Sequence, residues 1–477
     1  FKNSVASYTV SLLNPEIIKE MKLKEYGLKI VKRPISNFLP IDDKTYLKLG
    51  GGLERTQEEF KKFSEKDAAR LPEYYDRIEA VADVLRDISV KTPPNPKKGI
   101  KAVLGAALQL WPIATKGNQV HRDVYDLFTK SARSFLDSWF ENEHIKAAFG
   151  FDSTVGNFAS PDTPGSAYVL LHHVFGEIDG EKGVWGHAIG GMGSITQAME
   201  KACKNMGVKI FTDAPVNKVI VKDNAAVGIE LQDGSSIVAN KIISNLNPKL
   251  LYKKLISEDE LEPEFNRGMD GYKCGSGTFR MNVALAELPD FSVLPGKEVG
   301  EHHQSGIVIA PTLDYMDKAY IDAKSQGWSS APIVEMLIPS TIDNTLAPDG
   351  KHVASLFCQQ FSPTMPDGSS WHDHRLAAAD TIIETVTKHA PNFRESILGM
   401  MILSPLDLEE KFGLIGGDIM HGQMSLDQMW AARPLMNYGN YRGPLKSLYM
   451  CGSGTHPGGG VTGLPGKNAA REILKDG

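Results

Sequence analysis

The chain has 477 residues and a formal net charge of −6, with 42% hydrophobic and 23% charged residues, a composition typical of globular proteins with two or three domains. This charge offers no basic field for nucleic acid or anionic lipid, and no apolar run reaches the roughly 18 residues of a membrane-spanning helix. The four cysteines are far apart and form no CxxC pair, which argues against a disulfide framework or a zinc knuckle and favours a reducing compartment.

The first part of the chain passes from extended to helical patterns. Residues 28–52 alternate apolar and polar positions around turn residues, which predicts a hairpin. Residues 53–88 carry apolar side chains at helical spacing, and residues 119–150 resume that spacing after a proline-rich loop at 92–99. Residues 100–114 form the most apolar run, which we interpret as a buried or interfacial helix.

The second part of the chain mixes strand and helix signals. Residues 194–207 predict an amphipathic helix opened by Ser194 and closed by Gly207. Strand candidates follow at 208–212, 216–223, 226–234 and 236–245. The Asp233-Gly234 pair predicts a hairpin turn. Further strand-like runs lie within 271–360, and residues 371–400 return to a helical pattern.

The C-terminal stretch is the most informative. Residues 448–451 form a short apolar strand, 452–463 a glycine-rich loop, and 465–474 a helix whose first turn accepts Pro465 at no cost. Glycines let backbone N–H groups approach an anion closely, and a helix N-terminus attracts negative charge. The pattern predicts a pyrophosphate or nucleotide site, with a tight turn as the alternative.

The same loop spells GxGxxG at Gly458, Gly460 and Gly463, but its context differs from the first turn of a dinucleotide-binding fold. That fingerprint lies within a βαβ unit and is followed about 20 residues later by an acidic residue for the ribose. In the printed sequence only 14 residues follow Gly463. We therefore expect this loop to hold another part of a nucleotide.

A second glycine cluster, Gly190-Gly191-Met192-Gly193, precedes the helix predicted at 194–207. Residues 183–189 are short and broken by glycines, so no strand is expected to run into the cluster. Two interpretations of this cluster stay open: a tight loop packed against a flat or bulky group, and a phosphate-binding site. The sequence favours the tight loop at least as strongly as the phosphate site.

The remaining motifs indicate no metal site and no nucleophile. The pairs His172-His173 and His302-His303, and the WHDH run at 371–374, match no metal-ligand spacing. Ser453 does not stand in a GxSxG elbow.

Residues 416–434 (GGDIMHGQMSLDQMWAARP) and 438–470 (YGNYRGPLKSLYMCGSGTHPGGGVTGLPGKNAA) resemble the C-terminal part of the phytoene desaturase-like FAD-dependent amine/carotenoid oxidoreductases. More narrowly, they resemble the group called pyridine nucleotide-disulfide oxidoreductase domain-containing protein 2. Residues 183–248 are similar to the family's middle segment, and residues 1–18 resemble the stretch after its FAD fingerprint. The resemblance covers essentially the whole chain.

This resemblance implies a mixed α/β (α+β) fold. Residues 183–250 and 440–477 would form the remaining segments of a Rossmann-like FAD-binding domain. A substrate domain on a mixed or antiparallel sheet would come from residues 1–54 and 251–439. Residues 55–182 would form a mainly helical subdomain.

The resemblance also implies FAD as the cofactor. The cofactor neighbours carried over are Val216, beside the adenine, and eight loop residues: Gly452, Ser453, Gly454, Gly458, Gly459, Gly460, Val461 and Thr462. His187, His421, His456 and Trp185 lie in or near loops expected to approach the flavin, with a structural role as the alternative to a chemical one. No catalytic residue and no metal ligand is assigned.

The family's N-terminal GxGxxG unit and its ribose carboxylate are absent from these 477 residues. The sequence thus holds two of the three FAD-binding segments, so we expect this chain alone to bind FAD weakly or not at all, or to be inactive.

The activity implied is that of an FAD-dependent desaturase or dehydrogenase, which transfers a hydride from a C–H bond to flavin N5. A small, hydrophobic substrate would lie between residues 55–180 and 271–360. A non-catalytic interaction protein with a flavoprotein shell and a flavin-dependent isomerase are the alternatives. Protein partners and a homo-oligomer are left open, and the bacterial cytoplasm or the mitochondrial matrix is the expected compartment.

Overall fold

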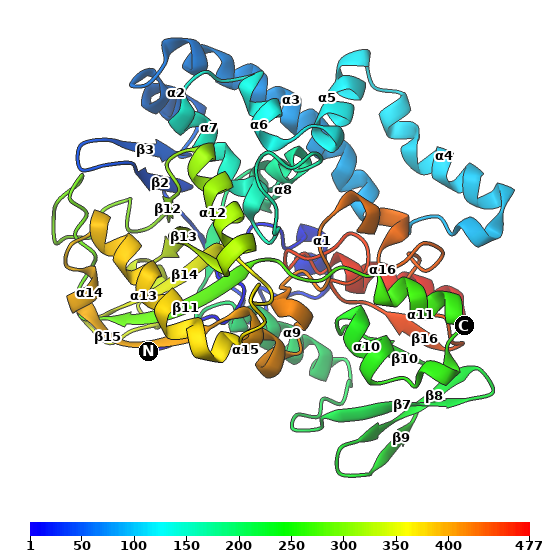
Figure 1. Ribbon diagram of the computed structural model, residues 1–477. Helices are drawn as coiled ribbons and strands as arrows, with labels where there is room; N and C mark the ends of the chain where they lie inside the picture. Colours follow the sequence, from blue (N-terminus) through cyan, green and yellow to red (C-terminus); the bar gives the residue numbers. More distant parts are fainter.

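The largest sheet has seven strands in the order β15-β11-β14-β13-β12-β2-β3 (Figure 1). The computed structural model describes the backbone of residues 1–477 and every side chain except those of Lys98 and Pro112. The strands are β2 (Asn37–Pro40), β3 (Tyr46–Leu49), β11 (Thr278–Leu285), β12 (Gly306–Ile309), β13 (Trp328–Leu337), β14 (His352–Phe361) and β15 (Ile397–Leu403). All neighbours are antiparallel except β12 and β2, which are parallel. The mixed sheet and the strands predicted within 271–360 are confirmed.

The two faces of this sheet are covered by different helices, because successive residues of a strand point to opposite sides. Val308 and Ile333 belong to a core that includes α12 (Leu313–Gln326). Ile307 and Val334 belong to a second core that includes α13 (Trp371–His389). The central strands are therefore apolar on both faces.

The helical part of the chain covers the first of these faces (Figure 1). Its helices are α2 (Leu53–Lys61), α3 (Glu65–Ser89), α4 (Ile100–Ala114), α5 (Asn118–Thr129), α6 (Ala132–Asp137), α7 (Glu143–Gly150) and α8 (His172–Phe175). The helix predicted over 53–88 is divided because the side chain of Ser64 caps α3 by accepting a hydrogen bond from the N–H of Asp67. Leu71, Ile78 and Val81 are buried, as their spacing predicts.

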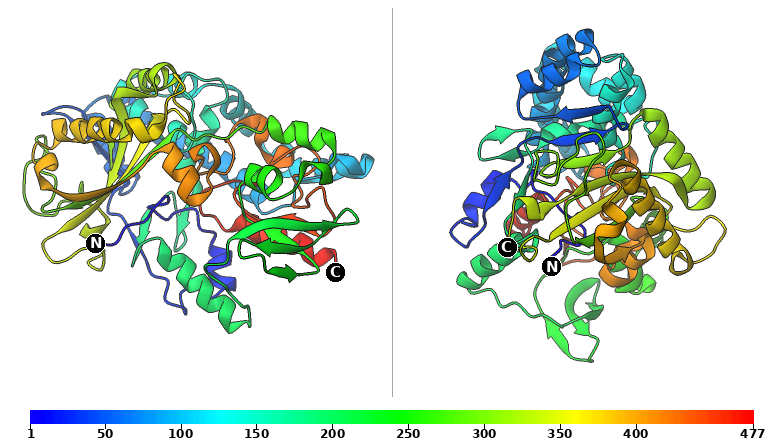
Figure 2. Two further views of the ribbon diagram at one scale, coloured as in Figure 1. Left: turned by 60° about the horizontal axis from the view of Figure 1, so that its bottom comes forward. Right: turned by 90° about the vertical axis from the view of Figure 1, so that its left-hand side faces the viewer.

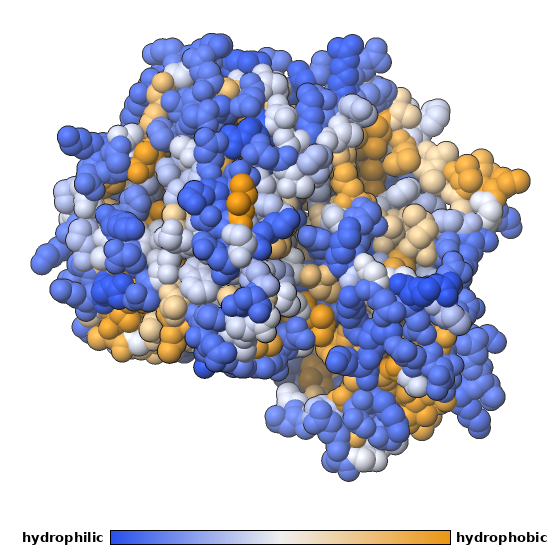
Figure 3. Space-filling model, in the orientation of Figure 1, coloured by the Kyte–Doolittle hydropathy of each residue, from blue (hydrophilic) through white to orange (hydrophobic). Residues whose placement is uncertain are grey.

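Helix α4 has the predicted bounds but is not buried. Its apolar side chains face solvent, with Ile100 80% and Leu108 74% exposed, and Figure 3 shows the apolar surface of this projecting region. The first alternative, a buried helix, is therefore wrong, since little of the chain packs on α4, whereas the interfacial alternative stays a prediction. Among the described residues, no helix combines the length and the apolar character needed to cross a membrane.

The C-terminal strand and helix lie beside a middle segment of the chain (Figure 2). Strand β16 (Leu448–Met450) pairs in parallel with β10 (Ile242–Ser244) and leads through the glycine loop into α16 (Leu464–Lys475), as predicted. The prediction of one strand over 236–245 is wrong, because β9 (Ser236–Val238) pairs with β8 (Ala225–Leu231) and only β10 joins β16. The remaining elements here are β7 (Val216–Lys222), α10 (Pro248–Lys254) and α11 (Pro263–Asp270).

Two other predicted elements differ from the structure. Residues 208–212 are not a strand, and Val208 and Phe211 are 49% and 73% exposed, since no described strand lies against them. The helix predicted over 371–400 ends at His389, and residues 397–403 become β15 because they pair with β11 at the sheet edge. The bounds of the neighbouring helices are α14 (Phe393–Ser396) and α15 (Pro405–Phe412).

A short strand does run into the second glycine cluster. Strand β6 (Gly186–Ala188) pairs antiparallel with β1 (Ile30–Lys32) and is followed by α9 (Gly193–Asn205). A Cβ on Gly186 would lie 2.5 Å from the carbonyl oxygen of Val31, so the glycine that argued against a strand is what permits this pairing. The hairpin predicted over 28–52 is confined to β2 and β3. The remaining elements are α1 (Pro15–Glu20), β4 (Glu177–Ile178) and β5 (Glu181–Lys182).

Candidate functional site

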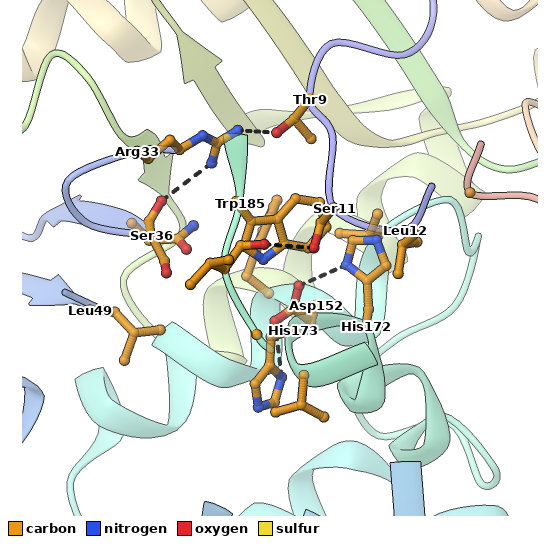
Figure 4. A pocket seen from close by; sticks show the side chains of 18 of the residues that line it. Thr9, Ser11, Leu12, Arg33, Ser36, Leu49, Asp152, His172, His173 and Trp185 are labelled. Atoms are coloured by element: carbon orange, nitrogen blue, oxygen red, sulfur yellow. Dashed lines mark hydrogen bonds and ion pairs between the residues drawn. The ribbon is translucent and has the colours of Figure 1, made fainter. Parts of the chain in front are cut away.

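A cavity of about 870 Å³ lies where several distant parts of the chain meet (Figure 4). Residues 6–12 form one wall, and residues from β1 to the start of α2 form another. Helix α3, the 3-10 turn η2 (Phe151–Thr154) and α8 line the helical side. Met420, His421, Gly460 and Val461 bring the C-terminal loops to the same space.

The glycines of the C-terminal loop permit close packing against other loops. A Cβ on Gly452 would lie 2.2 Å from the carbonyl oxygen of Asn245. A Cβ on Gly454 would lie 2.6 Å from Pro248, and one on Gly459 would lie 2.4 Å from the Met420 sulfur. Larger residues at these positions would push the loop away from β10 and from the 420 region.

Arg433 holds this loop in place, and sequence reasoning did not single it out. Its side chain is completely buried and donates hydrogen bonds to the carbonyl oxygens of Ser453 at 3.0 Å, Met420 at 2.7 Å and Gly422 at 3.1 Å. A fourth bond reaches the carbonyl oxygen of Gln428 at 3.3 Å. The planar guanidinium can satisfy several carbonyl groups at once, which an ammonium cannot do in the same geometry.

The second half of the loop presents unused hydrogen-bond donors. In the described structure, none of the six backbone N–H groups of residues 458–463 donates to a protein acceptor. Gly460 and Val461 lie on the cavity wall, and a Cβ on Gly460 would lie 2.8 Å from Leu12. Val461 adopts a left-handed φ of 58°, which turns the main chain at the wall. Such a run of donors suits a group rich in hydrogen-bond acceptors.

The structure brings together only part of the predicted set of cofactor neighbours. Gly460 and Val461 line the cavity, whereas Val216 begins β7 and does not lie on the described cavity wall. The other predicted residues lie in the same loop without lining the cavity: Gly452, Ser453, Gly454, Gly458, Gly459 and Thr462.

Of the candidate tryptophan and histidine residues, two line the cavity and two make structural contacts inside the protein. Trp185 and His421 line the cavity. His187 is buried in β6, and its Nε2 accepts a hydrogen bond of 3.2 Å from the Nε–H of Arg33. Burial and the charge of Arg33 lower the pKa of His187, so its ring is neutral. Burial lowers the pKa of His421 and lowers that of His456 to about 4. His456 Nε2 lies 3.2 Å from the carbonyl oxygen of Ile88, a structural contact to the end of α3.

Polar side chains occupy the floor of the cavity. Arg33 donates to Thr9 Oγ1 at 2.6 Å and to the carbonyl oxygen of Ser36 at 3.3 Å. The hydroxyl of Tyr8 donates to the carboxylate of Glu335. Burial raises the pKa of Glu335, although the nearby Arg33 and the bond from Tyr8 lower it. These groups form one connected network beneath the open space.

The second glycine cluster is already occupied by protein groups. Asp343 Oδ2 accepts a hydrogen bond of 2.6 Å from the N–H of Gly190, and Ser4 Oγ accepts one of 3.0 Å from the N–H of Met192. The tight-loop interpretation fits these contacts better than a phosphate site. Among the described side chains, no group of three His, Cys, Asp or Glu residues is placed to hold a metal ion.

Comparison with known proteins identifies the family of the chain. Residues 23–278 match the sequence profile of the family described as flavin containing amine oxidoreductase. The chain belongs to this family. Pyridine nucleotide-disulfide oxidoreductase domain-containing protein 2 of Rattus norvegicus is 37% identical over the whole chain and 85% of its own length. Lycopene-forming phytoene desaturase of Pantoea ananas is 23% identical over 88% of this chain and 78% of its own.

Solved structures agree on the fold of this flavin containing amine oxidoreductase. A triple mutant of putrescine oxidase superposes with a TM-score of 0.56 at 14% identity, over 100% of this chain and 90% of that chain. The protein is thus an FAD-dependent oxidoreductase in fold and family.

The cavity wall has features that suit a cofactor such as FAD. The N–H groups of Gly460 and Val461 make no protein hydrogen bond and lie on the wall, where they could donate to acceptor atoms of the cofactor, and Gly460 leaves room there. When bound, FAD would supply the oxidising chemistry, since it can accept a hydride, which carries two electrons, from a substrate. Gly460, Val461 and Trp185 are the residues we expect beside it.

Proposed function

We propose that this protein oxidises a C–H bond of a small substrate that is mainly hydrophobic, in the manner of a desaturase or dehydrogenase. The observation that carries the proposal is the shared cavity. Its wall joins Gly460 and Val461 of the cofactor loop to the substrate-side sheet and helices. A substrate in this space would lie against the flavin end of the cofactor.

Most of the remaining wall suits an apolar body. Its apolar residues come from several elements: Leu12, Leu49, Phe151, Val155, Phe357, Leu414 and Ile419. Each buried methylene of a substrate contributes about 0.8 kcal/mol. A chain or ring of several carbons would therefore gain most of its binding free energy here.

Ion pairs ring the cavity at its charged side. Lys32 Nζ lies 2.5 Å from Glu181 Oε2, and Lys182 Nζ lies 2.8 Å from Glu79 Oε1. All four residues line the cavity, and each charge is compensated by its partner. We infer that these two ion pairs attract neither a cationic nor an anionic substrate, because each pair carries no net charge.

The affinity of these 477 residues for FAD is proposed to be weak. Strands β10 and β16 form a two-stranded parallel pair in the described structure, and the loop at 452–463 is its glycine-rich turn. Apart from loop 452–463, no glycine-rich turn is described on strands β10 and β16. The adenosine end of FAD would therefore lack the backbone N–H contacts that dominate pyrophosphate binding. Titration of FAD into the chain should show weak, saturable binding; stoichiometric FAD retained through purification would contradict this.

The proposed function is tested by anaerobic bleaching of the flavin. The chain is saturated with FAD and mixed with alcohols, amines and unsaturated lipids of increasing chain length. We expect loss of the visible flavin absorbance, at a rate that rises with the apolar length of the substrate. A flavin that is bound in the cavity but bleached by none of these compounds would overturn the proposal.

A further inference from the structure

One polar group on the cavity wall is outside the network of Arg33 and Glu335. His172 and His173, at the start of α8, approach the carboxylate of Asp152 in η2 from the two sides (Figure 4). His172 Nδ1 lies 3.2 Å from Oδ1 and His173 Nδ1 lies 3.3 Å from Oδ2. All three residues line the cavity.

The carboxylate fixes which nitrogen of His172 carries the proton. Burial raises the pKa of Asp152, but the contacts from His172 and His173 outweigh it and hold that pKa below its ordinary value. The ionised carboxylate can only accept hydrogen bonds, so Nδ1 of His172 must be the donor. Nε2 of a neutral His172 is then unprotonated and available as a base.

The two histidines are not equivalent. The side chain of His172 is 25% exposed, packs 4.9 Å from the ring of Trp185, and has no described hydrogen-bond partner at Nε2. His173 is 10% exposed and packs beside the rings of Tyr74 and Phe149, and neither of its ring nitrogens has a hydrogen bond in the described structure. His172 therefore faces the open space, while His173 packs behind it.

We propose that His172 is the proton acceptor of this enzyme, that Asp152 is the residue that positions it, and that the substrate presents an O–H or N–H group there. The inference rests on the proposed function and deepens it. The substrate then has a hydrophobic body along the apolar wall and one polar, proton-bearing end at His172. This explains why a mainly apolar cavity keeps an oriented imidazole, which would be left unpaired by a pure hydrocarbon.

The chemistry balances within the site. The substrate carbon loses a hydrogen with both bonding electrons, which the FAD of this family accepts. The adjacent oxygen or nitrogen loses its proton to Nε2 of His172, and its single bond to that carbon becomes double. The imidazolium that forms is adjacent to the Asp152 carboxylate, whose negative charge stabilises it.

The first test reads the tautomer of His172 and requires no turnover. Nitrogen-15 NMR of the histidine rings, with His172→Gln to identify the signals, should show the Nδ1–H tautomer in the wild-type protein. Asp152→Ala should move His172 towards the Nε2–H tautomer. Glu410→Ala is the matched control, because Glu410 pairs with His372 3.1 Å away on a remote surface. An Nε2–H tautomer in the wild type, or no response to Asp152→Ala, would overturn the proposal.

The second test separates a chemical role from a structural one. With FAD saturating and a substrate that bleaches the flavin, His172→Gln should slow bleaching by about 10²–10⁴-fold with a smaller change in substrate affinity. Added imidazole should restore part of the rate of His172→Ala, whereas His372→Gln should bleach at the wild-type rate. A folded His172→Gln variant with the full rate would refute the assignment. If no compound bleached the flavin of the wild type, the proposed function would be rejected instead. The tautomer measurement would still decide whether Asp152 positions His172 as a base.

Discussion

Arg433 is a buried cation whose hydrogen bonds all go to main-chain carbonyl groups. Arg433 acts through its geometry, since its one planar guanidinium holds Ser453 of the glycine-rich loop 452–463 close to Met420 and Gly422. Sequence reasoning could not find it, because a single arginine in the 416–434 segment shows no pattern that tells a clamp from a surface charge. Only the packing of three loops around it shows the role.

Replacing Arg433 by methionine keeps much of the apolar volume and removes the donors. We expect the free energy of unfolding to fall by about 3 kcal/mol or more, because several buried carbonyl groups lose their partners. Urea unfolding measures this. Arg394→Met is the matched control, since Arg394 forms an exposed ion pair with Asp380 and its loss should cost less than about 1 kcal/mol. Equal losses in the two variants would contradict the role of Arg433.

His456 predicts a dependence of stability on pH. Burial holds its pKa at about 4 in the folded protein, below the ordinary value of 6.5. Between these values the unfolded chain binds a proton that the folded chain does not, so stability is lost as pH falls from 6.5 towards 4. From pH 7 to pH 5 we expect this residue to account for about 2 kcal/mol of the loss in free energy of unfolding.

The test compares His456→Gln with the wild type by urea unfolding at both pH values. The variant should lose less stability on acidification, because glutamine takes up no proton in this range. His372→Gln, at an exposed histidine, should show the wild-type loss. An unchanged loss in His456→Gln would show that other groups cause the pH dependence.

At the scale of elements, the C-terminal loop and helix contain two glycines whose replacement by alanine should change stability in opposite directions. Gly460 has a φ of +107° and a wall contact to Leu12, whereas Gly466 lies in α16, where a Cβ would have no described atom within 4 Å. Gly460→Ala should lower both stability and FAD affinity, because the backbone is strained and Leu12 is displaced. Gly466→Ala should stabilise the protein by about 0.5–1 kcal/mol, since alanine favours helix.

Thermal unfolding and FAD titration of the two variants check this pair. The expected result is weaker FAD binding only in Gly460→Ala. If Gly466→Ala impaired FAD binding as much as Gly460→Ala, the cavity face of the loop would not be where the cofactor lies.

The elements show which local signals suffice and which do not. Strands β11 to β14 of the seven-stranded sheet follow from their own apolar runs, because a central strand buries both faces. Residues 208–212 have the same apolar character but no described strand beside them, so propensity alone mispredicts them. Residues 397–403 show the opposite case: their sequence pattern predicts a helix, but they form a strand because they pair with β11.

At the scale of the whole molecule, the fold class and the C-terminal strand, glycine-rich loop and helix could be predicted from the sequence, whereas the cavity could not. Its wall joins Leu12, Asp152, His172 and Gly460, which are far apart in the chain. The His172-His173 pair was visible as a motif, but its meaning depends on Asp152, which only the packing of η2 against α8 supplies. Likewise, Val216 and Gly460 both belong to the predicted cofactor neighbours, but only Gly460 lies on the cavity wall.

The arrangement of the molecule also explains how the parts cooperate. The sheet and helices shape the cavity, the C-terminal loop is proposed to offer donors to the cofactor, and His172 is proposed to act as a base. Each part alone is common among proteins, and the proposed oxidation requires all three at one cavity.

The central claim is that the cavity supports net oxidation with FAD. The most direct measurement quantifies, under anaerobic conditions and with FAD saturating, the product formed and the flavin bleached in a single turnover. We expect equal amounts of bleached flavin and of a product that has lost two hydrogen atoms. A rearranged product with the flavin still oxidised would indicate an isomerase, and no product would indicate a non-catalytic protein; either result would overturn the proposed oxidation.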